Sequence, residues 1–458
     1  MSKVGAAPGP ELHNPSWARS LLFAALATAI SCHAAWPGFM SYDSLYTYAA
    51  SGTGVDTALW PPLHAYLFWF SRAAGAETWG LFAAQTFLLF LAAGITIHLT
   101  IASRGLAALL CLLFAATFAA IPAQIGVLSA HWRDVPTASF TLAGLALYLL
   151  SARKESRVLL AAGITSLGLA VALRYNAILL VAGLLLIMIW RPVLGNSTSG
   201  RVTAIMATVI ALALAWASTH WRAPDFSPLA QPDSLGGTRE FDLIGISACA
   251  GRVYLPAAVT GGQNISPRQV RTAYDPRHLQ LSLAAKPGGP RMLETGGEGD
   301  VARTWWFLLR HEPRCYAAHR LQVFIHQMGF SREGAFYPIH AAIDPNPYGL
   351  KLARPAAAAR LMTYVTLRAA KPWRQPWLLY LAGAAAGLLI IGRRGPMRQV
   401  IAALLVGSFA YAGVLYFVAP AADARYIFPS NTTAALAIVL ALGLIAEERL
   451  QRRKFRVV

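Results

Sequence analysis

Long runs of apolar residues, broken by short polar stretches, dominate this chain of 458 residues. A run of about 20 apolar residues with few charges is typical of a helix that crosses a membrane. Ten runs fit this pattern. The sequence therefore predicts an α-helical integral membrane protein of about ten transmembrane helices, at residues 18–35, 79–102, 106–122, 135–151, 158–173, 177–190, 202–218, 376–391, 399–418 and 427–446.

One long polar region separates the seventh span from the eighth. It mixes short apolar stretches, such as 241–250, with turns such as Gly261-Gly262, and residues 305–309 and 317–328 have the spacing of amphipathic helices. We interpret it as a mixed extracytoplasmic domain. The predicted organisation is an N-terminal membrane module of seven spans and their outer loops at 1–218, the extracytoplasmic domain at 219–375, a three-span membrane module at 376–446 and a basic cytoplasmic tail at 447–458.

A shorter amphipathic pattern follows the first span. Trp60, Leu63, Tyr66, Leu67 and Phe70 recur at helical spacing, after a Pro-Pro pair that favours a helix start. The segment is too short to cross a membrane. It is either an aromatic-rich helix lying in the membrane interface or a helix packed inside the protein.

Composition supports the membrane class, because 56% hydrophobic and 13% charged residues exclude a soluble globular protein of this size. The formal charge of +19 raises the question of nucleic-acid binding. With the N-terminus placed inside, 16 of the 39 Lys and Arg residues fall in inside segments, four in short outside loops and 19 in the long region. This asymmetry follows the positive-inside rule. It predicts cytoplasmic termini, a large extracytoplasmic domain, contact with membrane lipids and no nucleic-acid partner.

The few charges near the spans gather on the outside. Asp43 follows the first span, and a carboxylate at a membrane boundary is costly to bury without a function. Charges where several spans converge indicate a polar cavity at the outer leaflet. The other short outside loops carry His131-Trp-Arg133-Asp134, Arg174-Tyr-Asn176 and Asp423-Ala-Arg425-Tyr426.

Structural interpretations of the same residues stay open. Asp423 and Arg425 can anchor the last span at the interface. Arg133 and Asp134 can form an adjacent, solvent-facing pair that contributes little to stability. His64 lies on the short amphipathic segment, where a histidine is more often a packing or hydrogen-bonding residue than a catalyst.

Taken together, these motifs resemble the GT-C superfamily of integral-membrane glycosyltransferases, and most nearly its bacterial members similar to protein O-mannosyltransferases and aminoarabinose transferases. The likeness covers roughly the first 190 residues and the last span, but not the domain between them. It implies a place in the cell envelope, in the bacterial inner membrane. The motifs are Pro37-Gly38-x4-Asp43, Arg133-Asp134, Arg174-Tyr-Asn176, and Ala424-Arg425-Tyr426 followed by Pro429.

The resemblance implies an inverting glycosyltransferase that moves a sugar from a polyprenyl-phosphate donor to a glycan, lipid or protein acceptor. Asp43 resembles the base of the family, which takes the acceptor proton. Asp134 would orient the acceptor, hold an arginine or ligate a metal. Arg425 is the first candidate to bind the leaving phosphate, followed by Arg174 and Arg133. The remaining candidates for substrate binding are Tyr426, His131 and His64.

Metal dependence and two other functions stay open. Many mannosyl- and oligosaccharyltransferases carry an Asp-Glu pair where this chain has Asp43-Ser44. A divalent metal, if any, would lie on Asp43 and Asp134. A lipid-linked polysaccharide polymerase or ligase would use arginines and a histidine without needing Asp43. A sugar-lipid transporter or flippase is disfavoured, because no internal repeat is visible in the sequence.

Four cysteines are too few for a disulfide framework. Cys249 and Cys315 are the two that lie outside the predicted spans, and in an oxidising compartment they can pair. Cys32 and Cys111 fall within spans, where a cysteine behaves as a small buried apolar residue.

Overall fold

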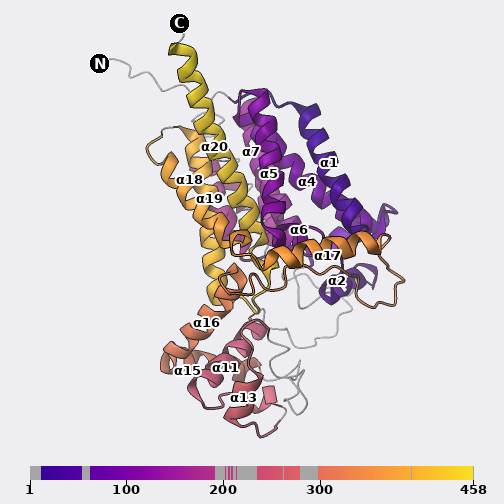
Figure 1. Cartoon of the computed structure of the whole chain (residues 1–458), viewed down its shortest axis with the longest axis vertical. Coiled ribbons are helices and arrows are strands. Elements are labelled where there is room, and N and C mark those ends of the chain that lie inside the picture. Colours follow the sequence, from indigo (N-terminus) through magenta and orange to yellow (C-terminus); the bar gives the residue numbers. More distant parts are fainter. Residues whose placement is uncertain are drawn as a thin grey trace.

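The structure is a computed structural model of the whole chain. It describes residues 12–53, 62–190, 235–260, 262–278, 298–393 and 395–456, together with six isolated positions between 202 and 213. The described part is almost entirely helical. Figure 1 shows a bundle of long helices above a smaller group of short ones, with α20 reaching to the end of the bundle farthest from that group.

Nine of the ten predicted spans coincide with helices, and the tenth, at 202–218, lies outside the described residues apart from the isolated positions. The protein is thus a helical, multi-pass membrane protein. The nine helices are α1 (Trp17–Ala35), α4 (Glu77–Thr100), α5 (Arg104–Ala120), α7 (Asp134–Lys154), α8 (Arg157–Leu173), α9 (Ala177–Trp190), α18 (Trp377–Ile390), α19 (Pro396–Val418) and α20 (Phe428–Arg456).

The predicted number of ten spans is not confirmed. Five described helices are long and apolar enough to cross a membrane. A sixth results if α5 and α6 (Pro122–Leu128), which are bent by 94°, are counted as one broken span. The difference is one of length, because α8, α9 and α18 are apolar but shorter than the roughly 20 residues that a span requires.

Small residues allow the central helices to pack closely. A Cβ atom on Gly144 of α7 would lie 2.5 Å from Cδ2 of Leu167, and one on Gly163 of α8 would lie 3.0 Å from the Gly144 carbonyl oxygen. Close approach at small residues is typical of membrane helices, where the lipid supplies no hydrophobic drive for association. α7 and α20 are the most buried of the long helices, whereas α1 lies at the edge of the bundle.

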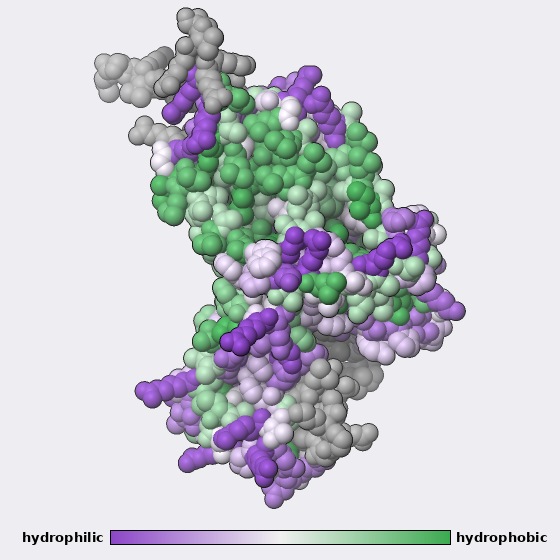
Figure 2. All heavy atoms as spheres, viewed as in Figure 1, coloured by the Kyte–Doolittle hydropathy of each residue, from purple (hydrophilic) through white to green (hydrophobic). Residues whose placement is uncertain are grey.

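The surface agrees with a membrane location. Figure 2 shows apolar side chains covering the bundle in a broad band, with polar side chains gathered above and below it. Exposed large apolar residues of this kind would be an aggregation hazard in water. They include Leu22, Ile30, Leu112, Leu388 and Val406.

Short elements close one end of the bundle, which we call the site end. They are α2 (Tyr42–Thr53), α3 (Leu63–Ala73), α6, α17 (Pro355–Ala369), η1 (Pro372–Arg374) and η2 (Ala424–Ile427). The predicted amphipathic helix is α3. One side of it packs inside the protein, and the other side is exposed, as a helix in the membrane interface would be. His64 and Phe68 are buried against the protein, whereas Tyr66, Trp69 and Phe70 are exposed.

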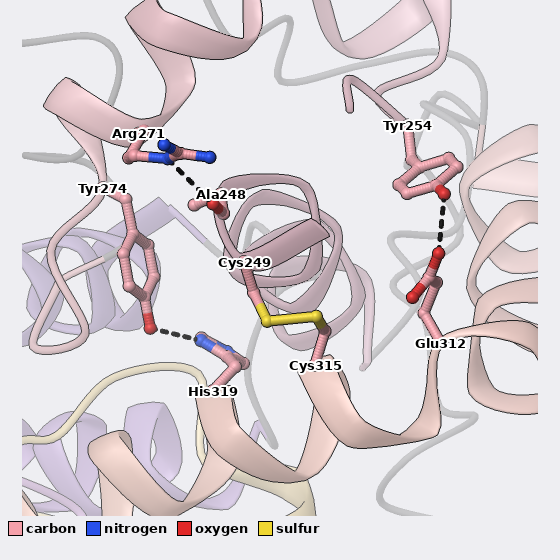
Figure 3. The surroundings of a disulfide bond; sticks show 8 residues. All are labelled: Ala248, Cys249, Tyr254, Arg271, Tyr274, Glu312, Cys315 and His319. Carbon is pink, nitrogen blue, oxygen red and sulfur yellow. Dashed lines mark hydrogen bonds between the residues drawn. A yellow bond between two sulfur atoms is a disulfide. The ribbon is translucent and has the colours of Figure 1, made fainter. Parts of the chain in front are cut away.

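The described part of region 219–375 forms a helical domain next to the site end, with α11 (Gly236–Ala250), α12 (Ala257–Thr260), α13 (Pro267–Ala273), α15 (Glu298–His311) and α16 (Pro313–Met328). The amphipathic stretches at 305–309 and 317–328 are confirmed as parts of α15 and α16. Cys249 and Cys315 form a disulfide between α11 and α16, as Figure 3 shows.

A buried carboxylate joins this domain to the bundle. Oδ2 of Asp242 accepts a hydrogen bond from Nε1 of Trp305 at 2.7 Å, and Oδ1 lies 2.6 Å from Nε of Arg320. Nη1 of Arg320 donates to the carbonyl of Ala419, directly after α19, at 2.6 Å. The domain is therefore anchored to the loop between α19 and α20, which carries Asp423 and Arg425.

Candidate functional site

The site begins at the turn that follows α1. The Trp36–Pro37 peptide bond is cis, and Gly38 has a φ of +109°. A Cβ atom at Gly38 would lie 2.4 Å from Nε2 of His131, so any other residue would both clash and be strained. Nε2 of His131 in turn donates to the carbonyl of Pro37 at 3.0 Å. The Pro-Gly element of the first motif therefore allows the second motif to pack directly against it.

Backbone hydrogen bonds hold these two motifs together. The N–H of Phe39 donates to the carbonyl of Ser129, and the N–H of His131 donates to the carbonyl of Phe39, both at 2.9 Å. Oγ of Ser44 donates to the His131 carbonyl, also at 2.9 Å. Asp43, in the first turn of α2, is thereby fixed beside the start of α7.

Arg425 connects two carboxylates. Its Nη1 donates to Oδ2 of Asp43 at 2.7 Å, across 382 residues of sequence. Its Nε lies 3.1 Å from Oδ2 of Asp423. The Asp43 side chain is 41% exposed, whereas that of Asp423 is 11% exposed. Burial raises the pKa of Asp423, and the charge of Arg425 opposes this rise. One arginine thus pairs with an open carboxylate and a buried one.

Aromatic rings hold the Arg425 guanidinium in place. Its Cζ lies 5.1 Å from the ring centroids of both Trp132 and Tyr426. Such cation–π contacts stabilise the cation and restrict its plane. Nε1 of Trp132 donates to Oγ of Ser41 at 3.0 Å, so this ring is itself held by the segment that carries Asp43.

A second ion pair lies deeper. Nε of Arg174, at the end of α8, is 2.8 Å from Oδ1 of Asp134, and both side chains are at least nine-tenths buried. Burial lowers the pKa of Arg174, but the charge of Asp134, together with the nearby Tyr411 and Tyr426, outweighs burial and leaves the pKa raised. The Arg174 Cζ lies 4.9 Å from the ring centroid of Tyr426, so Tyr426 contacts both arginines. Asp134 is therefore not part of a solvent-facing pair.

Arg133 completes a group of three guanidinium ions. It is half-buried just before α7. Burial, and then the positive charges of Arg174 and Arg425, lower the pKa of Arg133 to about 10, with Asp134 acting in the opposite direction. Arg133 stays cationic at neutral pH. Its positive charge borders the same cavity as the ion-paired Arg425, where it would attract an anion.

Two neutral histidines lie on the other side of the site. The Phe68 ring is 5.1 Å from that of His64 and 5.2 Å from that of His131, centroid to centroid. Burial, reinforced by His131 and Arg133, lowers the pKa of His64 to about 3. Burial lowers the pKa of His131 to about 4, against the effect of its hydrogen bond to Pro37. Nε2 of His64 and Nδ1 of His131 have no hydrogen-bond partner in the described part of the chain.

These groups enclose a cavity of about 20 Å³. This volume admits a group the size of a water molecule, so a sugar can enter only if the site opens. Six of the eight predicted site residues line the cavity, while Arg174 and Tyr426 lie behind it. The lining residues are Asp43, Ser44, Thr47, His64, His131, Trp132, Arg133, Asp134 and Arg425.

The buried histidines should make stability fall in acid. An unfolded histidine takes up a proton near pH 6.5, whereas folded His64 and His131 resist it until about pH 3 and 4. The contribution of the two neutral histidines to the free energy of unfolding is therefore fully present above pH 6.5. Below that, each pH unit costs about 1.4 kcal/mol per histidine until the folded pKa is reached. We expect the unfolding midpoint of the double variant His64→Gln/His131→Gln to fall less than that of the wild type between pH 7.5 and 5.

The matched control for this measurement is His311→Gln, because His311 is exposed on α15. It should lose as much stability in acid as the wild type. Equal acid sensitivity of the wild type and the double variant would show that other groups govern the effect.

A segment that the sequence did not mark also reaches the site. We call residues 335–350 the strap. The N–H of Ala424 donates to the carbonyl of Phe336, and the N–H of Met40 donates to the carbonyl of Ala342, both at 2.9 Å. A Cβ atom on Gly126 of α6 would lie 2.1 Å from the Pro338 carbonyl oxygen, so the strap lies tightly against α6. The strap thus binds the segments that carry Asp43 and Arg425 to one another.

Three strap side chains form a hydrogen-bonded series that ends at α2. The Tyr337 hydroxyl donates to Nδ1 of His340 at 2.5 Å, and Nε2 of His340 lies 3.2 Å from Oδ1 of Asp344. Oδ2 of Asp344 accepts from the N–H of Tyr42 at 2.8 Å. Asp344 therefore caps the helix on which Asp43 is the next residue. The i, i+4 spacing of His340 and Asp344 is the one signal that the sequence offered.

Replacing Asp344 should misplace Asp43 without removing it. With Asp43 in the role of base that the resemblance implies, we expect Asp344→Ala to lower kcat by about 10- to 100-fold with little change in donor KM, because small displacements of a reacting group cost this much. Asp344→Asn should recover part of the loss, since its amide oxygen can still accept from Tyr42. Asp300→Ala, an exposed residue of α15, is the control. A pure loss of donor affinity in Asp344→Ala would contradict a positioning role.

The residues of the site do not fit a divalent metal. Nowhere in the described ranges does a group of three or more His, Cys, Asp or Glu side chains lie close enough together to hold one. Asp43 and Asp134, the two carboxylates considered for this purpose, each pair with an arginine instead.

Comparison with known proteins gives a distant structural likeness. No protein-family model matches the chain, and no curated protein matches it. Two solved structures do: ArnT from Cupriavidus metallidurans bound to undecaprenyl phosphate, and the same protein in the apo state. They are 15% and 14% identical to this chain, with TM-scores of 0.33 and 0.32. The matches cover 94% and 92% of this chain and 79% and 76% of ArnT.

Proposed function

We propose that this protein is a membrane glycosyltransferase that moves a sugar from a polyprenyl-phosphate donor to the hydroxyl of a glycan, lipid or protein acceptor. The reaction takes place at the site end of the bundle, which we assign to the outer face of the bacterial inner membrane. The observation that carries the proposal is the contact of Asp43 with Arg425 at the cavity. This contact supports the proposal, because a carboxylate that can accept a proton lies next to a cation whose geometry suits phosphate.

In this proposal Asp43 acts on the acceptor, as the general base. The acceptor oxygen attacks the anomeric carbon while its proton passes to the Asp43 carboxylate. Because Asp43 is partly open to solvent, this proton can then leave to water. The neutral rings of His64 and His131 offer unpaired nitrogens to sugar hydroxyls, which binds the sugar without adding charge.

The arginines act on the donor, by binding its phosphate. As the bond between the anomeric carbon and the phosphate oxygen breaks, negative charge grows on the lipid phosphate. The planar fork of Arg425 can bind two phosphate oxygens, and Arg133 adds a second charge at the same cavity. Arg174 stays paired with Asp134 and supports the site from behind. Direct displacement, with base and leaving group on opposite faces of the sugar, inverts the anomeric configuration.

Donor binding has to break a contact that is present in the site. A phosphate that binds Arg425 must compete with Asp43 for the same Nη1 group. Release of Asp43 from Arg425 would free the carboxylate as a base at the moment when the phosphate takes its place. Donor binding and activation of the base are thereby coupled through one arginine.

The test is turnover by the purified full-length protein in liposomes, with a panel of polyprenyl-phosphate sugars and candidate acceptors. We expect release of polyprenyl phosphate to equal the formation of glycosylated acceptor. Movement of labelled sugar-lipid across the bilayer without release of lipid phosphate would instead favour a flippase.

A further inference from the structure

A second cavity lies at the end of the bundle opposite to the site, where α1 begins, α4 ends and α5 begins. Its volume is about 410 Å³, far more than that of the site cavity. Two arginines and two histidines are among its lining residues, and no acidic residue is. The full lining is His13, Asn14, Pro15, Ser16, Arg19, His98, Ile101, Ala102 and Arg104.

The two arginines lie close together. Nη1 of Arg19, in the first turn of α1, donates to the backbone carbonyl of Arg104, the first residue of α5, at 3.3 Å. Within the described ranges no ion pair joins either side chain to a carboxylate. Two unneutralised guanidinium groups at one cavity repel each other, and an anion between them would remove this repulsion.

A buried histidine points to the same kind of ligand. His98 of α4 is 5% exposed, and it lines the cavity. Among the described residues its ring makes no hydrogen bond with the protein. Because the ring borders the cavity, a ligand there that accepts a hydrogen bond can be reached by a His98 nitrogen.

Glu447 marks the boundary of this site. Its carboxylate accepts hydrogen bonds from the N–H groups of Ala102 and Ser103, at 2.7 and 3.2 Å. The negative charge of Glu447 therefore neutralises the positive N-terminal end of α5. Among the described residues, from residue 12 on, no carboxylate is recorded at the start of α1: Ser16 makes no side-chain cap there, and the first turn holds no acidic residue. The positive end of α1 therefore faces the cavity together with Arg19.

The surfaces next to the cavity are apolar. α1 exposes Leu21, Leu22 and Leu26 below Arg19, and α5 exposes Leu109 and Leu112 below Arg104. A cationic cavity continuous with such faces suits a molecule with an anionic head and hydrocarbon chains better than a free anion.

We propose that this cavity binds the phosphate headgroup of an acidic phospholipid, whose acyl chains lie along α1 and α5. Arg19 and Arg104 bind the phosphate oxygens, and His98 donates a further hydrogen bond. The site is separate from the proposed glycosyl-transfer centre and does not depend on it.

The test uses the delipidated full-length protein in detergent micelles, titrated with phosphatidylglycerol or with phosphatidylcholine of the same acyl chains. Bound lipids are counted by native mass spectrometry. We expect the wild type to bind phosphatidylglycerol at least about tenfold more tightly than phosphatidylcholine, and Arg19→Gln/Arg104→Gln to lose this preference. Arg157→Gln, an exposed arginine at the start of α8 and outside the cavity, should retain it.

His98→Leu supplies an independent check, because it removes the hydrogen bond without changing the exposed charge. It should weaken phosphatidylglycerol binding more than phosphatidylcholine binding. Equal lipid preference in the wild type and the double arginine variant would overturn the proposal. Displacement of phosphatidylglycerol by millimolar inorganic phosphate, but not by chloride of equal ionic strength, would overturn the choice of a lipid and indicate a free anion.

Discussion

Replacing Asp43 with asparagine should lower the rate of sugar transfer by about 10² to 10⁴, the usual contribution of a general base. Asparagine keeps the size of the side chain, and its amide oxygen can still accept from Arg425. It cannot take a proton from the acceptor. The loss should therefore fall on kcat, whereas donor affinity and the unfolding midpoint stay close to those of the wild type. Single-turnover release of polyprenyl phosphate, measured beside equilibrium donor binding, separates these effects.

Asp275→Asn is the matched control for this experiment. Asp275 also pairs with an arginine, Arg277, but it does not line the cavity. Its variant should keep full activity. If Asp43→Asn retains the wild-type rate, Asp43 is not the base, and the polymerase or ligase alternative, which does not need this residue, becomes the better interpretation.

The sequence predicted the membrane bundle well because apolar length is a strong local signal. The sequence was a poorer guide to the length of a helix where the apolar run and the helix differ in length. α8, α9 and α18 are apolar enough to be read as spans, yet they are short. At the other extreme, the last span and the basic tail are one helix, α20, as far as Arg456. Glu, Gln, Arg and Lys are good helix formers, so the end of the apolar run did not end the helix.

The site was predictable as a set of residues but not as a set of contacts. Asp43 and Arg425 were singled out because charges beside membrane spans are rare and costly. Their pairing, and that of Arg174 with Asp134, depends on how distant helices pack, which no local pattern encodes. The strap was missed for a related reason. Asp344 lies in a polar, proline-rich loop, and only its hydrogen bond to the start of α2 gives it a role.

Arg425 should be the most sensitive arginine, since its removal affects stability and transfer together. Arg425→Ala leaves buried Asp423 and nearby Asp43 without their shared cation, and breaking such a pair costs about 3 kcal/mol, the lower end of the range for buried pairs. Activity should fall below detection. Arg425→Lys keeps the charge but not the fork that reaches both carboxylates, so it should recover stability more than transfer.

A double variant separates the two effects. Arg425→Gln/Asp423→Asn removes the buried charge together with its partner, so its unfolding midpoint should rise well above that of Arg425→Ala. Its donor affinity should stay low, because neither change restores a cation for the lipid phosphate. The control is Arg277→Gln/Asp275→Asn, a more exposed pair whose loss should cost no more than about 1 kcal/mol. If restored stability brought back donor binding and transfer, Arg425 would be a structural anchor of the last span. If the unfolding midpoint is restored but donor binding and transfer are not, Arg425 acts by binding the lipid phosphate.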